Sequence, residues 1–549
     1  MQQPWHHSWP KDVPRTLEYP NISLFQMLER SRDRNPTAPS ITFYGKTLTY
    51  DALHAQVVSF SGALASRGIG PGDRVALHLP NVPHFPIAFF ACLRLGAIAV
   101  PTNPLYTPRE LSRQFADAGV RVVVSLDLLF HNLGPVCEEG QIDHVILCDV
   151  ADFLPSPLRW LYPLKKRKLQ RAAIPKTSLI TPYRETFGSE APASPAPVDP
   201  RTHPAVIQYT GGTTGVPRGA VLTHRNLLAN AMQTLHWIPH WAESELRFLA
   251  ALPYFHLYGL TTAMLAPILA GAEILLLPDP RDVHGVLKLI HKRRPTFFPG
   301  VPAMFQAIAS RPDLFRYDLR SLRACISGAA PLPVELKRKF EAVTEGHLVE
   351  GYGLTEASPV THCNPLFEPG RDGIGLPFPD TEAKIVDQGS GEGDLAPGEV
   401  GELAVRGPQV MQGYWKHPEE NALVLRDGWL LTGDIASMDS DGFFRILDRK
   451  KDLILVSGYN VYPREVEEAL LEHPQVQEAA VIGVSDGQGG ERIKAFLVGK
   501  AGASLNDEAL AAFCRSRLAP FKVPKEYAFV KELPKTIIGK VLRRELRAL

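Results

Sequence analysis

The sequence predicts an α/β protein: a large N-terminal domain of layered α/β subdomains with a β-rich, barrel-like module, followed by a small α+β domain. Two observations predict this class. The chain has 549 residues, which corresponds to three or four units at roughly 150 residues each. Short β-branched runs also alternate with helix-like stretches, the order that produces parallel sheets covered by helices.

The first third of the chain carries much of this alternation. Predicted helices at residues 87–96 and 108–119 separate apolar runs that we interpret as strands, at residues 74–80, 97–101, 121–126 and 144–150. Before them, ITFYGKTLTY at residues 41–50 predicts a hairpin that turns at Gly45 and Lys46. Its Gly-Lys-Thr is not a phosphate-binding P-loop, because Ser40 occupies the position of the first glycine in that motif.

Two segments interrupt the alternation. Residues 152–171, DFLPSPLRWLYPLKKRKLQR, are basic and aromatic, and their three prolines should limit a continuous helix. Residues 191–200, APASPAPVDP, are rich in proline and predict a linker between subdomains.

From residue 205 the α/β pattern resumes, with strands expected at residues 206–210, 219–224, 272–278, 296–302 and 322–328. Near residue 374 it changes to short strands and Gly-Pro turns, which predict the β-rich module. After residues 448–452 a helix, two strands and a second helix are expected, at residues 463–473, 478–484, 492–499 and 506–518. This order predicts the small α+β domain.

Residues 248–272 could be interpreted as a membrane-spanning segment. They contain no Asp, Glu, Lys or Arg and are long enough to span a bilayer. However, Pro253 would interrupt a spanning helix near its start, and polar residues such as His256 and Thr261 break the apolar run. We therefore expect a buried strand, loop and helix rather than a membrane span.

Composition and charge exclude several classes of protein. With 45% hydrophobic and 21% charged residues, the chain is too apolar to be disordered. Because 59 Lys and Arg balance 58 Asp and Glu, no global field favours a nucleic acid, and any anion must be bound by a local site. The six cysteines lack metal-ligand spacing and the N-terminus lacks a secretory signal, so we expect a reduced, zinc-free, cytoplasmic protein.

A glycine- and threonine-rich segment, YTGGTTGVPRG at residues 209–219, lies between two predicted strands. Adjacent glycines let a backbone fold round an anion, while hydroxyls and a guanidinium supply hydrogen-bond donors. The segment suits a polyphosphate, although an ordinary surface loop could have the same composition. The candidate anion-binding residues are Thr210, Gly211, Gly212, Thr213, Thr214, Gly215 and Arg218.

Four segments occur in the order found in the adenylate-forming superfamily of acyl-CoA synthetases, nonribosomal adenylation domains and luciferases. They are YTGGTTGVPRG, EGYGLTE (residues 350–356), DGWLLTGDIASMDSDGFFRILDRKKD (427–452) and PKTIIGKVLRREL (534–546). Over roughly residues 25–549, the chain most resembles the bacterial long-chain fatty acid–CoA ligases of this superfamily. One departure is Arg218, where the family usually has Lys; Arg keeps the charge but binds phosphate with a different geometry.

The resemblance implies an enzyme, an AMP-forming acid–thiol ligase with two half-reactions. The carboxylate of a long-chain fatty acid attacks the α-phosphate of ATP, with Mg²⁺, to give acyl-AMP and pyrophosphate; the thiol of coenzyme A then displaces AMP. Two alternatives stay open, namely a CoA ligase for a medium-chain or aromatic acid, and an acyl-AMP-forming or -binding protein that makes no thioester. Stand-alone fatty acyl-AMP ligases typically carry an insertion before the small domain, and residues 442–458 show none, which favours the CoA-forming enzyme.

The resemblance also implies which residues form the nucleotide site. Glu356 matches the Mg²⁺ ligand and Thr355 a contact with the α-phosphate. The ring of Tyr352 would lie against adenine, and the carboxylate of Asp434 could accept hydrogen bonds from both ribose hydroxyls. The other residues implied at this site are Gly328, Ala329, Ala330, Glu350, Gly351, Gly353 and Arg449, the last of which also reaches the ribose.

The remaining implied roles concern two domain poses. Residues 1–447 match the adenylation domain, residues 448–452 with Lys451 the hinge, and residues 453–549 the mobile C-terminal domain. Lys540 would swing in to bridge the acyl carboxylate and the α-phosphate side of ATP, and Gly458 would line the approach of the coenzyme A thiol. His256 matches the position that borders the substrate carboxylate, with a neutral core histidine as the alternative.

The expected partners are small molecules, namely a fatty acid, ATP and coenzyme A, and not nucleic acid. Residues 153–171 carry six basic and no acidic side chains beside aromatic and aliphatic groups, which suits the headgroup boundary of an anionic membrane. A disordered basic loop without a partner is an equal alternative. A cytoplasmic enzyme is expected, and both a peripheral contact with the inner face of the cytoplasmic membrane and a homodimer are left open.

Overall fold

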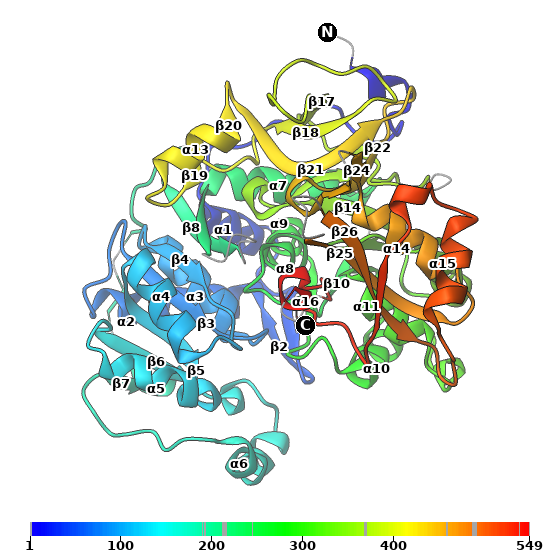
Figure 1. The fold of residues 1–549 in the computed structure, drawn as a ribbon. Helices are drawn as coiled ribbons and strands as arrows, with labels where there is room; N and C mark the ends of the chain where they lie inside the picture. The colour runs from blue at the N-terminus through cyan, green and yellow to red at the C-terminus, as the bar shows by residue number, and fades with distance from the viewer. Residues whose placement is uncertain are drawn as a thin grey trace.

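The computed structural model describes residues 3–188, 190–191, 194–210, 217–243, 245–366, 371–456, 459–485, 491–536 and 539–547. A large body contains two mostly parallel sheets, with an antiparallel module at the top of Figure 1, and a smaller C-terminal body lies beside α11 (Pro302–Ala309) and β14 (His347–Gly353). The α/β class and the two-part organisation predicted from the sequence are confirmed.

The first sheet has eight strands in the order β19-β9-β8-β4-β3-β5-β6-β7. Its strands from β8 to β7 pair in parallel, whereas β9 pairs antiparallel with both β8 and β19. The strands are β3 (Arg74–His78), β4 (Ile98–Pro101), β5 (Val120–Leu126), β6 (His144–Cys148), β7 (Ile180–Pro182), β8 (Pro204–Thr210), β9 (Arg218–Thr223) and β19 (Gly413–Tyr414). The helices that alternate with them are α2 (Tyr50–Ala65), α3 (His84–Arg94), α4 (Pro108–Ala118) and α5 (Phe130–Glu138).

The second sheet has nine strands in the order β16-β15-β14-β13-β12-β10-β11-β1-β2. The strands are β1 (Pro39–Phe43), β2 (Lys46–Thr49), β10 (Arg247–Ala250), β11 (Glu273–Leu276), β12 (Phe297–Gly300), β13 (Ala324–Ser327), β14, β15 (Val360–Cys363) and β16 (Leu376–Pro377). The run from β1 to β14 is parallel, with antiparallel strands at both edges. The β1–β2 pair confirms the hairpin predicted around Gly45 and Lys46.

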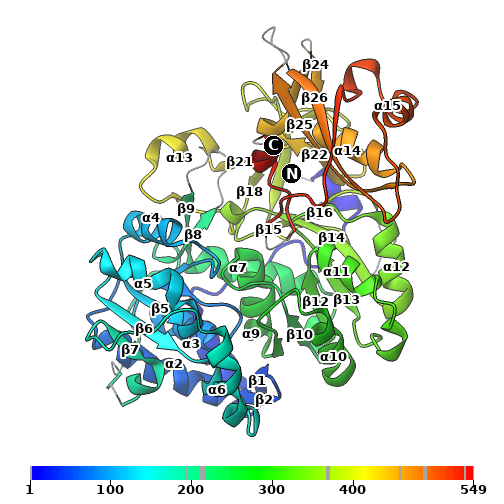
Figure 2. The ribbon, with the colours of Figure 1, turned by 60° about the horizontal axis from the view of Figure 1, so that its bottom comes forward.

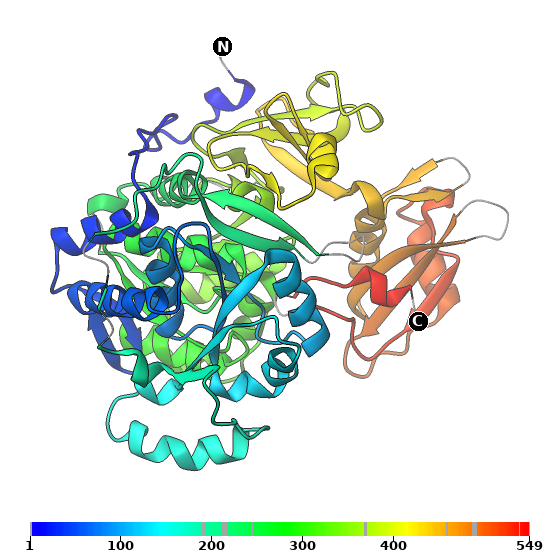
Figure 3. The same ribbon diagram turned by 90° about the vertical axis from the view of Figure 1, so that its left-hand side faces the viewer.

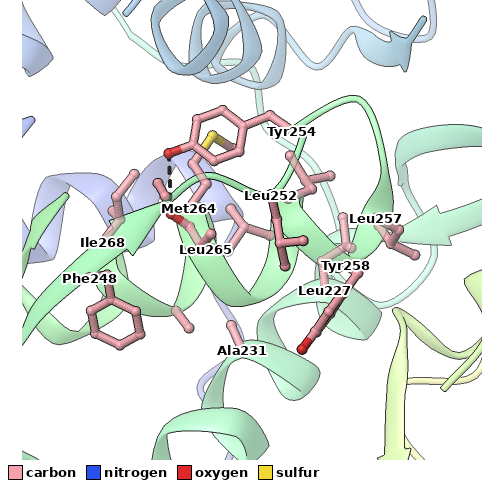
Figure 4. Packing of buried hydrophobic residues seen from close by; sticks show 14 of the residues in the cluster. Leu227, Ala231, Phe248, Leu252, Tyr254, Leu257, Tyr258, Met264, Leu265 and Ile268 are labelled. Carbon is pink, nitrogen blue, oxygen red and sulfur yellow. Dashed lines mark hydrogen bonds between the residues drawn. The ribbon is translucent and has the colours of Figure 1, made fainter. Parts of the chain in front are cut away.

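The uncharged stretch at residues 248–272 is almost entirely buried. It forms most of β10 and one continuous helical segment made of α8 (Leu257–Leu260), a π-helical turn (Thr261–Leu265) and α9 (Ala266–Ala270). Figure 4 shows side chains of this stretch packed together, with the Tyr254 hydroxyl donating to the carbonyl of Ala263 at 3.2 Å. The expectation of a buried strand, loop and helix is confirmed, and among the described residues no helix has the length and apolarity to cross a membrane.

One sequence prediction about the large body is wrong. The proline-rich residues 191–200 do not separate subdomains, because β7 before them and β8 after them belong to the same sheet. In the described part of this segment the Ala196 N–H donates to the carbonyl of Arg94 at 2.8 Å. The segment therefore returns the chain along the sheet from one edge to the interior, a route that its composition does not reveal.

The β-rich module is an antiparallel sheet of β17 (Glu382–Val386), β18 (Val400–Arg406), β20 (Leu425–Arg426), β21 (Trp429–Met438) and β22 (Phe444–Arg449). Closing a barrel requires the first and last strands to pair. Among the described residues β17 pairs with β18, while β20 and β22 pair with β21. The sheet is thus open, and the barrel-like part of the prediction is corrected.

The C-terminal body has the predicted order of helix, strand, strand and helix: α14 (Pro463–Leu471), β25 (Val476–Ser485), β26 (Glu491–Gly499) and α15 (Asp507–Arg515). Three of its strands were not predicted: β23 (Ile454–Val456) and β24 (Tyr459–Val461), which pair with each other, and the parallel edge strand β27 (Glu526–Phe529). Apolar side chains between residues 454 and 546 form clusters of their own, separate from the core of the large body.

A cluster of charged groups joins the last strand of the large body to the C-terminal body. The Arg543 guanidinium lies 2.7 Å from a carboxylate oxygen of Glu467 and 3.3 Å from oxygens of both Asp448 and Asp452. Asp448 also accepts a hydrogen bond from the backbone N–H of Arg464 at 2.7 Å. The two carboxylates of the predicted hinge, Asp448 and Asp452, are therefore held by groups of the C-terminal body.

Candidate active site

The predicted phosphate-binding segment connects two antiparallel strands. Thr210 ends β8 and lies opposite Arg218, the first residue of β9, and its hydroxyl donates to the Arg218 carbonyl at 3.5 Å. The candidate residues Gly211, Gly212, Thr213, Thr214 and Gly215 lie outside the described residues. The strands thus bring the two ends of the segment together at one edge of the first sheet.

Arg218 is engaged by protein groups. Its Nε lies 2.6 Å from a carboxylate oxygen of Glu420, and its guanidinium lies over the ring of Tyr414, 5.7 Å from the centroid. Both partners come from a distant part of the chain, brought here because β19 pairs with β9. An anion that binds Arg218 would have to compete with the carboxylate of Glu420.

Glu356 and Thr355 lie in a 3-10 turn (Thr355–Ala357) that directly follows β14. The Tyr414 hydroxyl donates to Oε1 of Glu356 at 2.8 Å, so the carboxylate lies close to the strand that carries Arg218. Among the described residues no group of three His, Cys, Asp or Glu side chains could hold a metal ion. One carboxylate fits Mg²⁺ nevertheless, because this ion is often bound by one or two carboxylates together with substrate phosphates.

Tyr352, Asp434 and Arg449 form a connected polar chain. Asp434 lies opposite Arg449 in the β21–β22 pair, and its Oδ1 is 2.6 Å from the Arg449 Nε. Its Oδ2 accepts a hydrogen bond from the Tyr352 hydroxyl. The negative charge of Asp434 raises the pKa of Arg449. Each carboxylate oxygen can still accept a second hydrogen bond, so Asp434 keeps capacity for a sugar hydroxyl.

The small residues of ISGAAPL follow β13. A side chain on Gly328 would place its Cβ 2.9 Å from the ring of Tyr258, whose hydroxyl donates to the Ile326 carbonyl at 2.8 Å. Gly328 is therefore required by packing inside the protein, a reason that the sequence did not reveal. Ala329 is exposed with a φ of 68°, and Ala330 is half-buried.

The residues around Tyr352 lie at the end of a parallel strand. Glu350 is half-buried and accepts a hydrogen bond from the Leu332 N–H at 3.1 Å, and burial raises its pKa to about 7. Gly351 is buried. Gly353 has a Cβ position only 2.0 Å from the carbonyl oxygen of Pro359, so no larger residue fits there without a backbone shift. This close approach sets the turn that leads to Glu356.

His256 caps the N-terminus of α8, where its Nδ1 accepts a hydrogen bond from the Tyr258 N–H at 3.3 Å. Burial, and to a smaller extent the charge of Lys540, lowers the pKa of His256 to about 4. Both the cap and the low pKa fit a neutral histidine.

Lys540 lies on a loop that packs against the large body. A Cβ built on Gly539 would be 3.2 Å from Cβ of Ala303 at the start of α11. The side chain of Lys540 is exposed, and the positive charge of Arg449 is the largest cause that lowers its pKa to about 8. Lys451, in a 3-10 turn (Lys450–Asp452), also has a lowered pKa, chiefly through burial and then through Arg449.

The predicted site residues that are described therefore gather around one junction. Glu356 connects to the segment of Arg218 through Tyr414, and Asp434 connects to Tyr352 and Arg449. Lys540 approaches the large body beside Gly539, whose Cβ position is 3.2 Å from Cβ of Ala303. Gly458 lies outside the described residues.

Sequence reasoning missed two residues of the site, Tyr414 and Glu420. Both lie about 60 positions or more from the groups they contact. The only local signal is the Gly413-Tyr414 pair, which forms the two-residue strand β19. Two residues are too few to show strand periodicity, so the pairing with β9 could not be inferred.

Comparison with known protein families gives two matches. Residues 28–415 match the model of the AMP-binding enzyme family. Residues 465–540 match the model of the AMP-binding enzyme C-terminal domain. Together the two matches cover both bodies of the fold.

Full-length relatives and solved structures agree with these matches. The chain is 48% identical to a long-chain-fatty-acid–CoA ligase of Bacillus subtilis over 99% of its length and 98% of that protein. A long-chain-fatty-acid–CoA ligase of Salmonella typhimurium is 40% identical over 100% of this chain and 98% of that protein. ATP-bound MatB of Rhodopseudomonas palustris is 29% identical and superimposes with a TM-score of 0.82, covering 96% of this chain and 99% of that one. The apo form of MatB, at 30% identity and the same coverages, gives 0.72.

Proposed function

The chain belongs to the family of AMP-binding enzymes, and from this membership we propose that it is a long-chain fatty acid–CoA ligase. It activates a long-chain fatty acid with ATP to give acyl-AMP and pyrophosphate, then transfers the acyl group to coenzyme A with release of AMP. The observation that carries this proposal is 48% identity to a long-chain-fatty-acid–CoA ligase over 99% of the chain. Relatives named for the same activity match at 40% identity over the whole chain, so other acids are not favoured.

In the first half-reaction two anions, the fatty carboxylate and the α-phosphate, must approach each other. We assign their neutralisation to Lys540, because a compact ammonium on a long side chain can bridge two oxygens. Its loop packs at Ala303, and its charge acts on His256, which would border the fatty carboxylate. Superposition is better on ATP-bound than on apo MatB, and this supports a pose suited to adenylation.

The nucleotide would be held by the polar chain of the large body. Asp434 would accept hydrogen bonds from the ribose hydroxyls, with Arg449 and Tyr352 fixing its carboxylate. The segment from Thr210 to Arg218 would hold the phosphates, together with Thr355. Glu356 would hold Mg²⁺, which when bound would neutralise negative charge on the phosphates. Tyr414 orients the Glu356 carboxylate for this task.

The second half-reaction requires a different pose of residues 453–549. A lysine that bridges the carboxylate and the α-phosphate in the first half-reaction would obstruct the approach of a thiol to the acyl carbonyl. Rotation at residues 448–452 would withdraw Lys540 and bring Gly458 to the approach of the coenzyme A thiol. The charge cluster of Arg543, Asp448 and Asp452 spans this hinge and would have to rearrange.

A panel of carboxylic acids tests the proposed function. We expect AMP release with long-chain acids to depend on coenzyme A and to exceed that with medium-chain or aromatic acids. Preference for a short or aromatic acid would favour the first alternative. Acyl-AMP that accumulates in the presence of coenzyme A, without a thioester, would favour a protein that stops at adenylation.

The pH dependence of adenylation gives a further test. The charge of Arg449 lowers the pKa of Lys540 to about 8, so the lysine is charged below this pH and loses its charge as the pH rises through it. We expect kcat/KM for ATP in ATP–pyrophosphate exchange to fall above about pH 8, because this constant reports ionisations of the free enzyme. Lys540→Arg keeps its charge throughout and should remove this fall even if its activity is low. A wild-type profile that stays flat up to about pH 10 would contradict the assignment.

We propose a cytoplasmic location in which the enzyme makes peripheral contact with the inner face of the membrane. Long-chain fatty acids partition into bilayers, so an enzyme at the bilayer surface would meet its substrate there.

A further inference from the structure

Helix α6 (Leu158–Leu169) projects from the large body and lies apart from the first sheet in Figures 1 and 3. Along this helix the only side chains that are not exposed are Tyr162 and Lys166, one helical turn apart. The ammonium of Lys166 lies 2.6 Å from a carboxylate oxygen of Asp149 and also pairs with Asp127. This pair of contacts identifies the inner face of α6 and holds the helix to the body.

The opposite face of α6 is apolar and exposed. Trp160 and Leu164, four positions apart, are 78% and 66% exposed, and the neighbouring Leu161 is 57% exposed. At 3.6 residues per turn, Trp160 and Leu164 lie on the side of the helix away from Tyr162 and Lys166. Large side chains gathered on a soluble surface in this way mark a contact with another apolar phase.

Basic side chains border this apolar face. Arg167 and Lys168 lie about one turn beyond Leu164 on the same outward side of the helix, and Arg159, Lys165 and Arg171 add further charge. All five are exposed, and within the described ranges none of them lies in an ion pair. Residues 153–171 contain no acidic side chain, so the positive charge is not balanced locally.

We propose that α6 docks the protein on an anionic lipid bilayer, with Trp160, Leu161 and Leu164 at the headgroup boundary and the basic side chains at lipid phosphates. An amphipathic helix with an aromatic and aliphatic face and flanking Lys and Arg has the composition of helices that lie in a membrane interface. A second copy of the chain fits less well, because a symmetric contact through α6 would bring two sets of unbalanced cations together. The paired Lys166 anchors the helix so that its apolar face stays outward.

This inference rests on the proposed function only for the reason to dock, because docking would bring the enzyme to a fatty acid dissolved in the bilayer. The contact between α6 and the bilayer does not depend on the proposed function.

The three prolines were expected to limit a continuous helix, yet Pro163 lies inside α6. A proline removes one backbone hydrogen bond, and the carbonyl that loses its donor can be solvated because the helix is exposed.

Co-sedimentation with vesicles tests the proposal. We expect the full chain to bind vesicles of phosphatidylcholine with phosphatidylglycerol, to bind less at high salt, and not to bind phosphatidylcholine alone. Arg167→Glu with Lys168→Glu, and separately Trp160→Ser with Leu164→Ser, should each weaken binding by about tenfold or more. The matched control is Arg338→Glu with Lys339→Glu on the exposed face of α12 (Val334–Thr344), which should leave binding unchanged.

Other outcomes would overturn the proposal. One is that the full chain does not bind anionic vesicles, and another is that the α12 control loses binding to the same extent. A third is that the full chain binds no vesicles but forms a dimer in sedimentation velocity, which the Trp160→Ser, Leu164→Ser variant converts to a monomer. AMP release from a fatty acid dispersed in detergent keeps the two proposals apart. Activity there without vesicle binding removes the docking surface but leaves the ligase, whereas vesicle binding without activity removes the ligase but leaves the docking surface.

Discussion

Lys540→Ala is expected to reduce acyl-AMP formation by about 100-fold or more, because it removes a charge that offsets repulsion between two anions in the transition state. Thioester formation from supplied acyl-AMP should be largely retained, since the lysine acts in the first pose alone. ATP–pyrophosphate exchange measures the first half-reaction, and coenzyme A thioester formation from synthetic acyl-AMP measures the second.

A neighbouring lysine provides the control for this variant. Lys535 lies on the same loop, but its Nζ is 2.6 Å from a carboxylate oxygen of Glu478 within the C-terminal body. Lys535→Ala should therefore leave both half-reactions nearly unchanged. If Lys540→Ala reduced both half-reactions equally, the role of Lys540 as a group of the first pose would be wrong.

Lys451→Pro is expected to have the opposite pattern, with exchange retained and acyl-CoA production collapsing. Lys451 lies in a 3-10 turn, where φ is near the value that proline imposes, so the present pose should tolerate the ring. A fixed φ would oppose the backbone rotation that the second pose requires. Single-turnover assays of the two half-reactions would separate these effects.

Lys451→Ala separates the hinge from the side chain. It removes the same ammonium but leaves the backbone free to rotate, so both half-reactions should continue. Survival of acyl-CoA production in Lys451→Pro would place the hinge elsewhere. Loss of exchange in Lys451→Ala would instead give the side chain a part in adenylation.

Much of the fold could be predicted from local patterns. The helix–strand alternation predicted the parallel sheets, and the hairpin at Gly45 was predicted correctly from its turn residues. The open sheet of β17, β18, β20, β21 and β22 was predicted as a β-rich module but not as an open one. Whether a sheet closes depends on pairing between its first and last strands, and residues in one strand carry no signal for a strand far along the chain.

The sequence by itself determined that one segment suits a polyphosphate, and its resemblance to the adenylate-forming superfamily implied a carboxylate for a hard cation and a lysine near the C-terminus. Residue type decides these properties, because charge and hydrogen-bonding capacity belong to the side chain wherever it lies.

The tertiary structure alone decided how these groups meet. The β9–β19 pair placed Tyr414 beside both Glu356 and Arg218, and the packing of Tyr258 showed why Gly328 has no side chain. The tertiary structure also turned Trp160 and Leu164 outward, because Lys166 is paired on the opposite face of the helix. Contacts of this kind join distant segments through burial and strand register, which are properties of the whole folded chain and leave no periodic trace in any one segment.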